Sequence, residues 1–108
     1  MSSLLNSYAS KDIGTAFVQV YTAPAGKSGT AIGANVANTT NSTIYCDIMI
    51  RKSGVDYYLI KGVYIPAGTA YVWSGAEQKI VLDSGDSFLV KSTVAASCDT
   101  IVSIAEVS

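Results

Sequence analysis

The eight residues "TIYCDIMI", at positions 43–50, decide the fold class because apolar side chains recur at every second position. Side chains that alternate with a period of two belong to a β-strand, where successive residues point to opposite faces of a sheet. The two faces predicted here are Ile44, Cys46, Ile48 and Ile50 on one side and Tyr45, Asp47, Met49 and Arg51 on the other. We expect the first set to enter a hydrophobic core.

The same period recurs from residue 13 onward, and no window carries an apolar helical stripe bounded by caps. Eight strands are predicted, near residues 13–22, 29–38, 43–50, 55–65, 69–74, 79–82, 86–94 and 99–107. Eight short strands separated by turn residues favour an all-β fold, a single-domain two-sheet antiparallel β-sandwich that is either jelly-roll-like or immunoglobulin-like. The sandwich domain is predicted over residues 13–108.

Residues 1–12, "MSSLLNSYASKD", are mostly polar and have Leu4, Leu5 and Tyr8 as their only large anchors. A polar terminal segment packs poorly by itself, so we predict an extended N-terminal arm that lies on a neighbouring subunit. The segment also lacks the basic start and the apolar run of a signal peptide, which predicts a chain made and kept in a cytoplasm.

Two related stretches, "VYTAPAG" at 20–26 and "VYIPAG" at 63–68, contain both prolines of the chain. Proline fixes φ near −65° and suits the second position of a turn, and glycine suits its exit. A phosphate-binding loop would lead into a helix N-terminus, whereas a strand follows each copy here. The repeat therefore predicts two tight turns that matter for folding.

The surface is expected to be poor in charge. Charged residues make up 14% of the chain, against about 25% in typical proteins. The seven basic residues are scattered, which excludes a nucleic-acid footprint, and no run approaches the roughly 20 apolar residues of a membrane span. A surface depleted in charge and rich in tyrosine is typical of protein contacts, so we predict a homo-oligomer.

The commonest catalytic side chain is missing. The chain has no histidine, the commonest general base and zinc ligand, so we predict that it is not an enzyme and binds no cofactor or metal. Cys46 and Cys98 each precede an aspartate, which raises a thiol pKa, and we expect both to be buried and reduced. Whether they form a bridge is open.

Two weaker alternatives concern ligands. Asp56, Asp83 and Asp86 could be imagined as a carboxylate pair or a calcium site, but "DSGD" is a common hairpin composition and supplies few oxygen ligands. Tyr71 and Trp73, with Tyr64 near the second "PAG" turn, could stack on a sugar, although aromatic residues at strand ends more often border a core.

Long segments of the chain resemble the small β-sandwich virion proteins of tailed bacteriophages. The resemblance runs from about residue 13 to the end and rests on "VANTT", "YLIKGVYIPAG", the closing pattern L-x-x-GD-x-F-x-V and a last strand that ends in "EV". Such proteins are capsid decoration, neck or tail components, and the family offers no catalytic residues to transfer. The resemblance implies a non-enzymatic virion protein made in the bacterial host cytoplasm.

Within that family we expect an outer capsid decoration or cement protein, with a neck or tail component as the alternative. A carbohydrate-binding or receptor-binding module is the alternative from another class. The expected partners are copies of the chain itself and other virion proteins, such as a major capsid protein, and the resemblance tilts the oligomer towards a trimer. The predicted contact residues, besides Leu4, Leu5 and Tyr8 in the arm, are Tyr45, Met49, Tyr57, Tyr58 and Tyr64.

Overall fold

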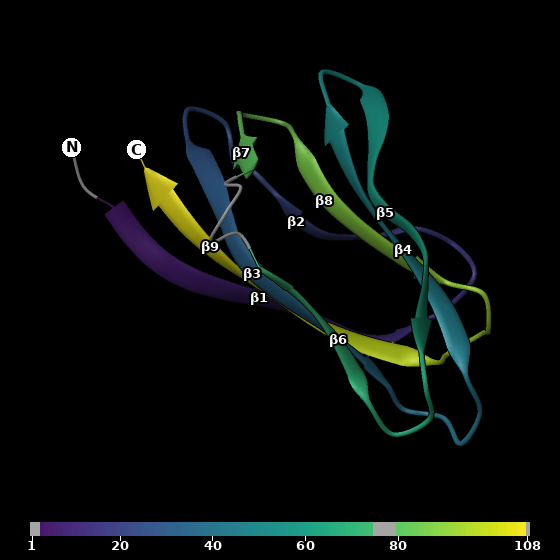
Figure 1. Cartoon of the computed structure of the whole chain (residues 1–108). Helices are drawn as coiled ribbons and strands as arrows, with labels where there is room; N and C mark the ends of the chain where they lie inside the picture. The colour runs from purple at the N-terminus through teal and green to yellow at the C-terminus, as the bar shows by residue number, and fades with distance from the viewer. Residues whose placement is uncertain (1–2, 75–79, 108) are drawn as a thin grey trace.

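The protein is an all-β sandwich in the computed structural model, which describes residues 3–74 and 80–107 (Figure 1). Its nine strands are β1 (Ser3–Ile13), β2 (Val18–Thr22), β3 (Ser28–Asn38), β4 (Ile44–Lys52), β5 (Val55–Ile65), β6 (Ala70–Ser74), β7 (Ile80–Leu82), β8 (Ser87–Ser92) and β9 (Cys98–Val107). The described residues contain no helix with the length and apolar character needed to cross a membrane. The predicted fold class is confirmed, with one strand more than expected.

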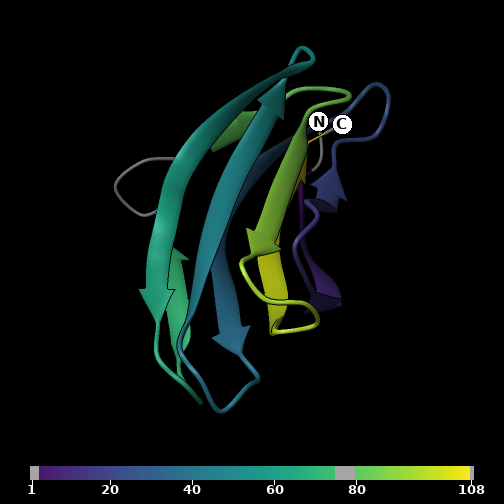
Figure 2. The same cartoon turned by 90° about the vertical axis from the view of Figure 1, so that its right-hand side faces the viewer.

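The strands form two antiparallel sheets. One sheet has the order β1-β9-β3-β6, with short β7 also paired to β3, and the other has the order β2-β8-β4-β5. The two sheets form the two layers seen in Figure 2. When β7 is left out of the count, the chain changes sheet at every connection except the β4–β5 hairpin, which is the order of a jelly roll, a fold of two Greek keys. The connectivity thus selects the jelly roll over the immunoglobulin alternative.

The core lies between the two sheets and follows the predicted alternation. Ile44, Cys46, Ile48 and Ile50 are all buried on the inner side of β4. From the neighbouring strand β8, Phe88 packs edge-on against Trp73 of the opposite sheet, with ring centroids 6.0 Å apart. Each fully buried large apolar side chain contributes about 1.5–3 kcal/mol, so this seam between the sheets is a main source of stability.

The two "PAG" segments are tight turns, but proline occupies a different position from the predicted one. The N–H of Lys27 donates to the Pro24 carbonyl (3.1 Å), and the N–H of Thr69 donates to the Pro66 carbonyl (3.2 Å). Proline is therefore the first residue of each turn and glycine the third. Gly26 and Gly68 have φ of 78° and 71°, a conformation that glycine adopts without strain.

The segment expected to be an N-terminal arm forms an edge strand of the same molecule. Strand β1 pairs with β9 in regular antiparallel register from Ser3↔Val107 to Ser10↔Thr100. The polar side chains that argued against a strand here lie on its inner side, where Asn6 and Tyr8 donate hydrogen bonds to Glu106. Contact of this segment with a neighbouring subunit stays a prediction.

Candidate interaction surfaces

The outer side of the five-stranded sheet presents three cross-strand rows, which we call the uncharged face. Strand pairing aligns its members across the sheet. The rows are Ala9, Ile101, Asn35 and Val72; Ser7, Ser103, Gly33 and Ser74; and Leu5, Ala105, Thr30 and Val81. Ile32, at an irregularity of β3, adds a further exposed side chain. None of these residues is ionisable.

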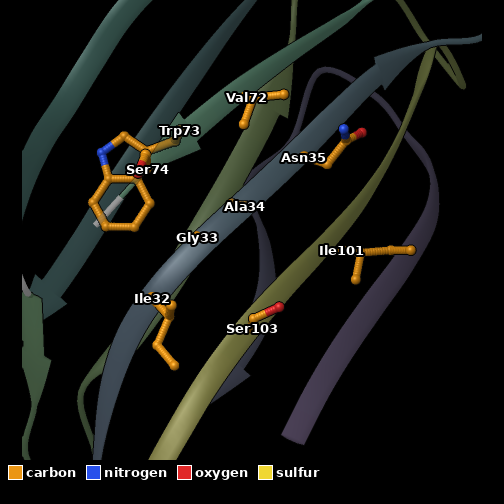
Figure 3. Close-up of a pocket in the computed structure, with 9 residues that line it drawn as sticks. All are labelled: Ile32, Gly33, Ala34, Asn35, Val72, Trp73, Ser74, Ile101 and Ser103. Carbon is orange, nitrogen blue, oxygen red and sulfur yellow. The ribbon is translucent and has the colours of Figure 1, made fainter. Parts of the chain in front are cut away.

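Large apolar side chains on this face are in contact with solvent. Leu5 is 78% exposed, Val72 65% and Ile101 53%. An open hollow of about 470 Å³ lies between Ile32, Val72 and Ile101, and Figure 3 shows its lining on β3 with β6 and β9 on either side. A second hollow of about 400 Å³ shares Ile32 and Ser103 with the first and reaches Leu5. Exposed apolar patches of this kind mark protein contact sites.

Three of the predicted contact tyrosines lie on the opposite side of the molecule, on the outer side of the four-stranded sheet. Tyr45 and Tyr64 pair across β4 and β5 and meet edge to face at 5.8 Å. Tyr58 pairs with Met49, which is only 5% exposed and therefore cannot be a major contact residue. Tyr57 is exposed but pairs with the inward-facing Ile50, so it lies on the other side of β5.

This tyrosine side, unlike the uncharged face, carries charged pairs. Arg51 Nε lies 2.7 Å from Asp56 Oδ1, and Lys91 Nζ lies 3.8 Å from Asp47 Oδ2. Lys61 Nζ stands 5.1 Å from the centre of the Tyr58 ring. The Arg51–Asp56 pair is exposed, and such a pair contributes little stability, but its charges stay hydrated. A neighbour that covered this side would have to displace water from these charges, which it would not have to do on the uncharged face. Contact through the tyrosines stays a prediction.

A buried carboxylate ties β1 and β2 to β9. Glu106 Oε1 accepts hydrogen bonds from Tyr8 Oη (2.8 Å) and Asn6 Nδ2 (3.0 Å), and Oε2 accepts one from Tyr21 Oη (3.0 Å). The hydrogen bond from Tyr8, with those from Asn6 and Tyr21, holds the pKa of Glu106 below its usual value despite burial. We call Asn6, Tyr8, Tyr21 and Glu106 the carboxylate clasp. Tyr8, a predicted intersubunit anchor, is thus engaged within its own chain.

Gly29 makes room for this clasp. A Cβ at Gly29 would meet the Tyr21 hydroxyl oxygen and lie 2.8 Å from Ile104 Cγ2. Only glycine therefore lets β3 pass so closely beneath the Tyr21 ring, which also packs against the Tyr8 ring in a tilted arrangement with centroids 4.7 Å apart.

The aspartates considered for a metal site form ion pairs. Asp86 Oδ2 accepts from Lys52 Nζ (2.9 Å) and from the N–H of Asp83 (3.0 Å), and Oδ1 accepts from the N–H of Ser53 (3.1 Å). Asp83 also contacts Lys52, and Asp56 pairs with Arg51. These bonds fasten the β4–β5 turn to the β7–β8 turn. Within the described ranges, no cluster of three or more potential metal-ligating side chains occurs.

The cysteines are free and buried, as the sequence predicts. Cys46 of β4 and Cys98 of β9 come from opposite sheets. A hydrogen bond with the Cys46 thiol, together with burial, raises the pKa of Cys98. A thiol held in its protonated form is a poor nucleophile, so Cys98 fits a packing role.

The two residues considered for sugar stacking, Tyr71 and Trp73, do not expose a pair of ring faces on which a sugar could stack. Trp73 is 5% exposed and packs on Phe88 in the core, while Tyr71 is partly buried against that core. Both faces of a buried indole are taken by protein atoms. Trp73 also borders the outer surface hollow, beside Val72 and Ser74 (Figure 3).

Comparison with known proteins identifies the fold and no family. No family model matches the chain, and no curated protein matches it in sequence. Among solved structures, it is similar to a chain from the crystal structure of the T13 IBDV viral particle, with a TM-score of 0.57 and 9% sequence identity. The similarity covers 96% of this chain and 30% of that chain. At this identity the likeness shows a shared sandwich fold.

Proposed function

We propose that the chain is a non-enzymatic structural component of a tailed-phage virion, an outer capsid decoration or cement protein that docks through its uncharged face. The observation that carries the proposal is that face, where Leu5, Ile32, Val72 and Ile101 stand exposed with no ionisable residue among them. A monomer that kept such a patch in water would tend to associate. The charged tyrosine side would remain towards solvent.

The fold and the resemblance support this assignment. A jelly roll is a common building block of viral particles, and the structural neighbour belongs to a viral particle. The segments "VANTT" and "YLIKGVYIPAG" resemble those of tailed-phage virion proteins. The chain would be made in the bacterial host cytoplasm, assemble with copies of itself and be incorporated into the particle beside capsid proteins.

The test is rebinding to particles of the phage that encodes the chain. Particles made without this protein are mixed with purified protein, labelled with an antibody to it, and viewed by electron microscopy. We expect label over the capsid for the natural chain. Label confined to the neck or tail would replace the decoration role with the alternative station, and particles that never contain or bind the protein would overturn the virion role.

Matched lysine variants test the docking face. Ile101→Lys puts a charge in the middle of the uncharged face, and Tyr64→Lys puts one at an equally exposed place on the tyrosine side. Exposed substitutions usually change stability by less than about 0.5 kcal/mol, so both variants should fold. We expect Ile101→Lys to lose most particle binding and Tyr64→Lys to keep it. The reverse pattern would move the docking site to the tyrosines.

A further inference from the structure

Strand β1 is an open edge of the five-stranded sheet. It pairs with β9 on one side, and Figure 1 shows it along the border of the molecule with no strand beyond it. Leu5, Asn6, Ser7 and Ala9 are exposed even though the strand is paired continuously from Ser3 to Ser10. Half of the peptide groups of such a strand point away from the sheet and can bind another strand.

The other described edges carry features that discourage strand addition. Strand β5 has Asp56 and Lys61 and is interrupted at Gly62, whose φ is 70° and whose N–H donates to Asp47 Oδ1 (2.7 Å). Strands β2 and β6 have 5 residues each and β7 has 3, and the register of β2 shifts between Gln19 and Tyr21. Charges, bulges and short length are the usual means of blocking an edge.

Strand β1 has none of these features over its first eight residues. From Ser3 to Ser10 it contains no charged residue, no proline and no glycine, and its register with β9 is continuous. The carboxylate clasp holds it against the sheet through Asn6 and Tyr8. An ordered, uncharged edge of this length is a template for a further strand. Because β1 is already ordered in the monomer, it loses little conformational entropy when another strand binds to it.

We propose that β1 pairs with β1 of a second copy of this chain, antiparallel about a twofold axis. Two identical open edges satisfy each other's peptide groups in an isologous contact. The segment is neutral, so bringing it against itself creates no like-charge repulsion, which a charged edge would suffer. The pairing does not depend on the proposed virion role and is expected of the purified protein in solution.

This geometry also joins the two uncharged faces. An antiparallel pair about a twofold axis perpendicular to the sheet leaves both outer sides pointing the same way, so the pair has one continuous sheet with a doubled docking surface. The contact by itself gives a dimer. The trimer expected from the resemblance would need a separate contact elsewhere on the molecule.

Charge variants of the edge test the pairing. Ser7→Lys with Ala9→Lys, and Ser7→Glu with Ala9→Glu, place like charges on both strands in any register that pairs these segments. We expect light scattering to give a dimer for the natural chain and at least a tenfold weaker dimer for each variant alone. A mixture of the lysine and glutamate chains should recover dimers, because opposite charges then face each other. Asn35→Lys, on the same face but two strands from the edge, is the control and should stay dimeric.

Hydrogen exchange separates edge pairing from other modes of association. Amides of β1 that point away from β9 should exchange more slowly as the concentration rises through the dimerisation range. A monomer at about 100 µM, a trimer unaffected by the edge charges, or a dimer whose β1 amides gain no protection would each overturn the proposal. Thermal melts followed by circular dichroism confirm that each variant is folded before its mass is compared.

Discussion

Removal of one tyrosine hydroxyl from the carboxylate clasp should lower the free energy of unfolding far more than removal of an ordinary surface hydroxyl. Tyr21→Phe deletes the donor 3.0 Å from Glu106 Oε2 and leaves that oxygen without this partner in a site where Glu106 is 7% exposed. A hydrogen bond to a charged group contributes about 1.5–3 kcal/mol. With a loss of about 2 kcal/mol, the melting temperature of a domain near 100 residues should fall by roughly 8–16 °C.

The matched control is Tyr45→Phe, which removes the hydroxyl of a half-exposed tyrosine. This variant should change the unfolding free energy by less than about 0.5 kcal/mol. Urea unfolding at pH 7 gives both values. Equal losses for the two variants, or a loss below about 0.5 kcal/mol for Tyr21→Phe, would refute the view that Glu106 is a charged buried acceptor.

The pH dependence supplies a second readout of the same site. Because the folded pKa of Glu106 lies below its usual value, its ionised form stabilises the fold above the unfolded pKa, and this contribution disappears as the pH falls through the folded pKa. Glu106→Gln should therefore be less stable than the natural chain at pH 7, with a difference that shrinks at acid pH. A difference that is independent of pH would show that packing alone, and not charge, is involved.

Two further predictions concern the turns. Asp86→Asn should destabilise the fold by about 1–3 kcal/mol in urea unfolding at pH 7, because a buried acceptor of two N–H groups and Lys52 loses its charge. Burial raises the pKa of Asp86, but the bonds from Lys52, Ser53 and Asp83 lower it more, so this loss should also fade towards acid pH. The control Asp56→Asn, at an exposed pair, should have a much smaller effect on the unfolding free energy. Pro66→Ala should cost about 0.4–1 kcal/mol through the unfolded chain and leave particle binding unchanged, and lost binding at an unchanged melting temperature would make this turn a contact site.

Local patterns predicted the strands well because side-chain alternation is a property of a few neighbouring residues. The period of residues 43–50 identified the inner side of β4, with Ile44, Cys46, Ile48 and Ile50 buried. It also placed Met49 on the outer side, but could not reveal that this residue would lie between Tyr58 of β5 and Leu89 of β8 and be buried. Burial on the outside of a sheet depends on cross-strand neighbours, which a single strand does not specify.

The edge strand β1 was missed for a related reason. Its inner side carries Asn6 and Tyr8, which look like surface residues until Glu106, about a hundred positions away, supplies the acceptor. One signal was available in the sequence: Glu106 falls at an inward position of the last predicted strand, in step with Val102 and Ile104. A charged residue on a core face calls for polar partners, and the tyrosines and asparagine of the first segments were candidates.

The distribution of charge explains why the two outer sides of the sandwich differ. The sequence shows that charge is scarce, and the fold shows that the described charges are divided unequally: Arg51, Asp56, Lys61 and Lys91 lie on or beside the tyrosine side, and Lys52, Asp83 and Asp86 fasten two turns. None of them lies in the three rows of the uncharged face, although Lys11 and Asp99 follow at the end of the same sheet, beyond the row of Ala9 and Ile101. The low overall charge predicted a protein that contacts others. The tyrosines predicted a contact on the four-stranded sheet, whose outer side carries hydrated charges. The uncharged face is the contact side that we propose, because a neighbour need displace no hydrated ion to cover it; contact through the tyrosines stays a prediction.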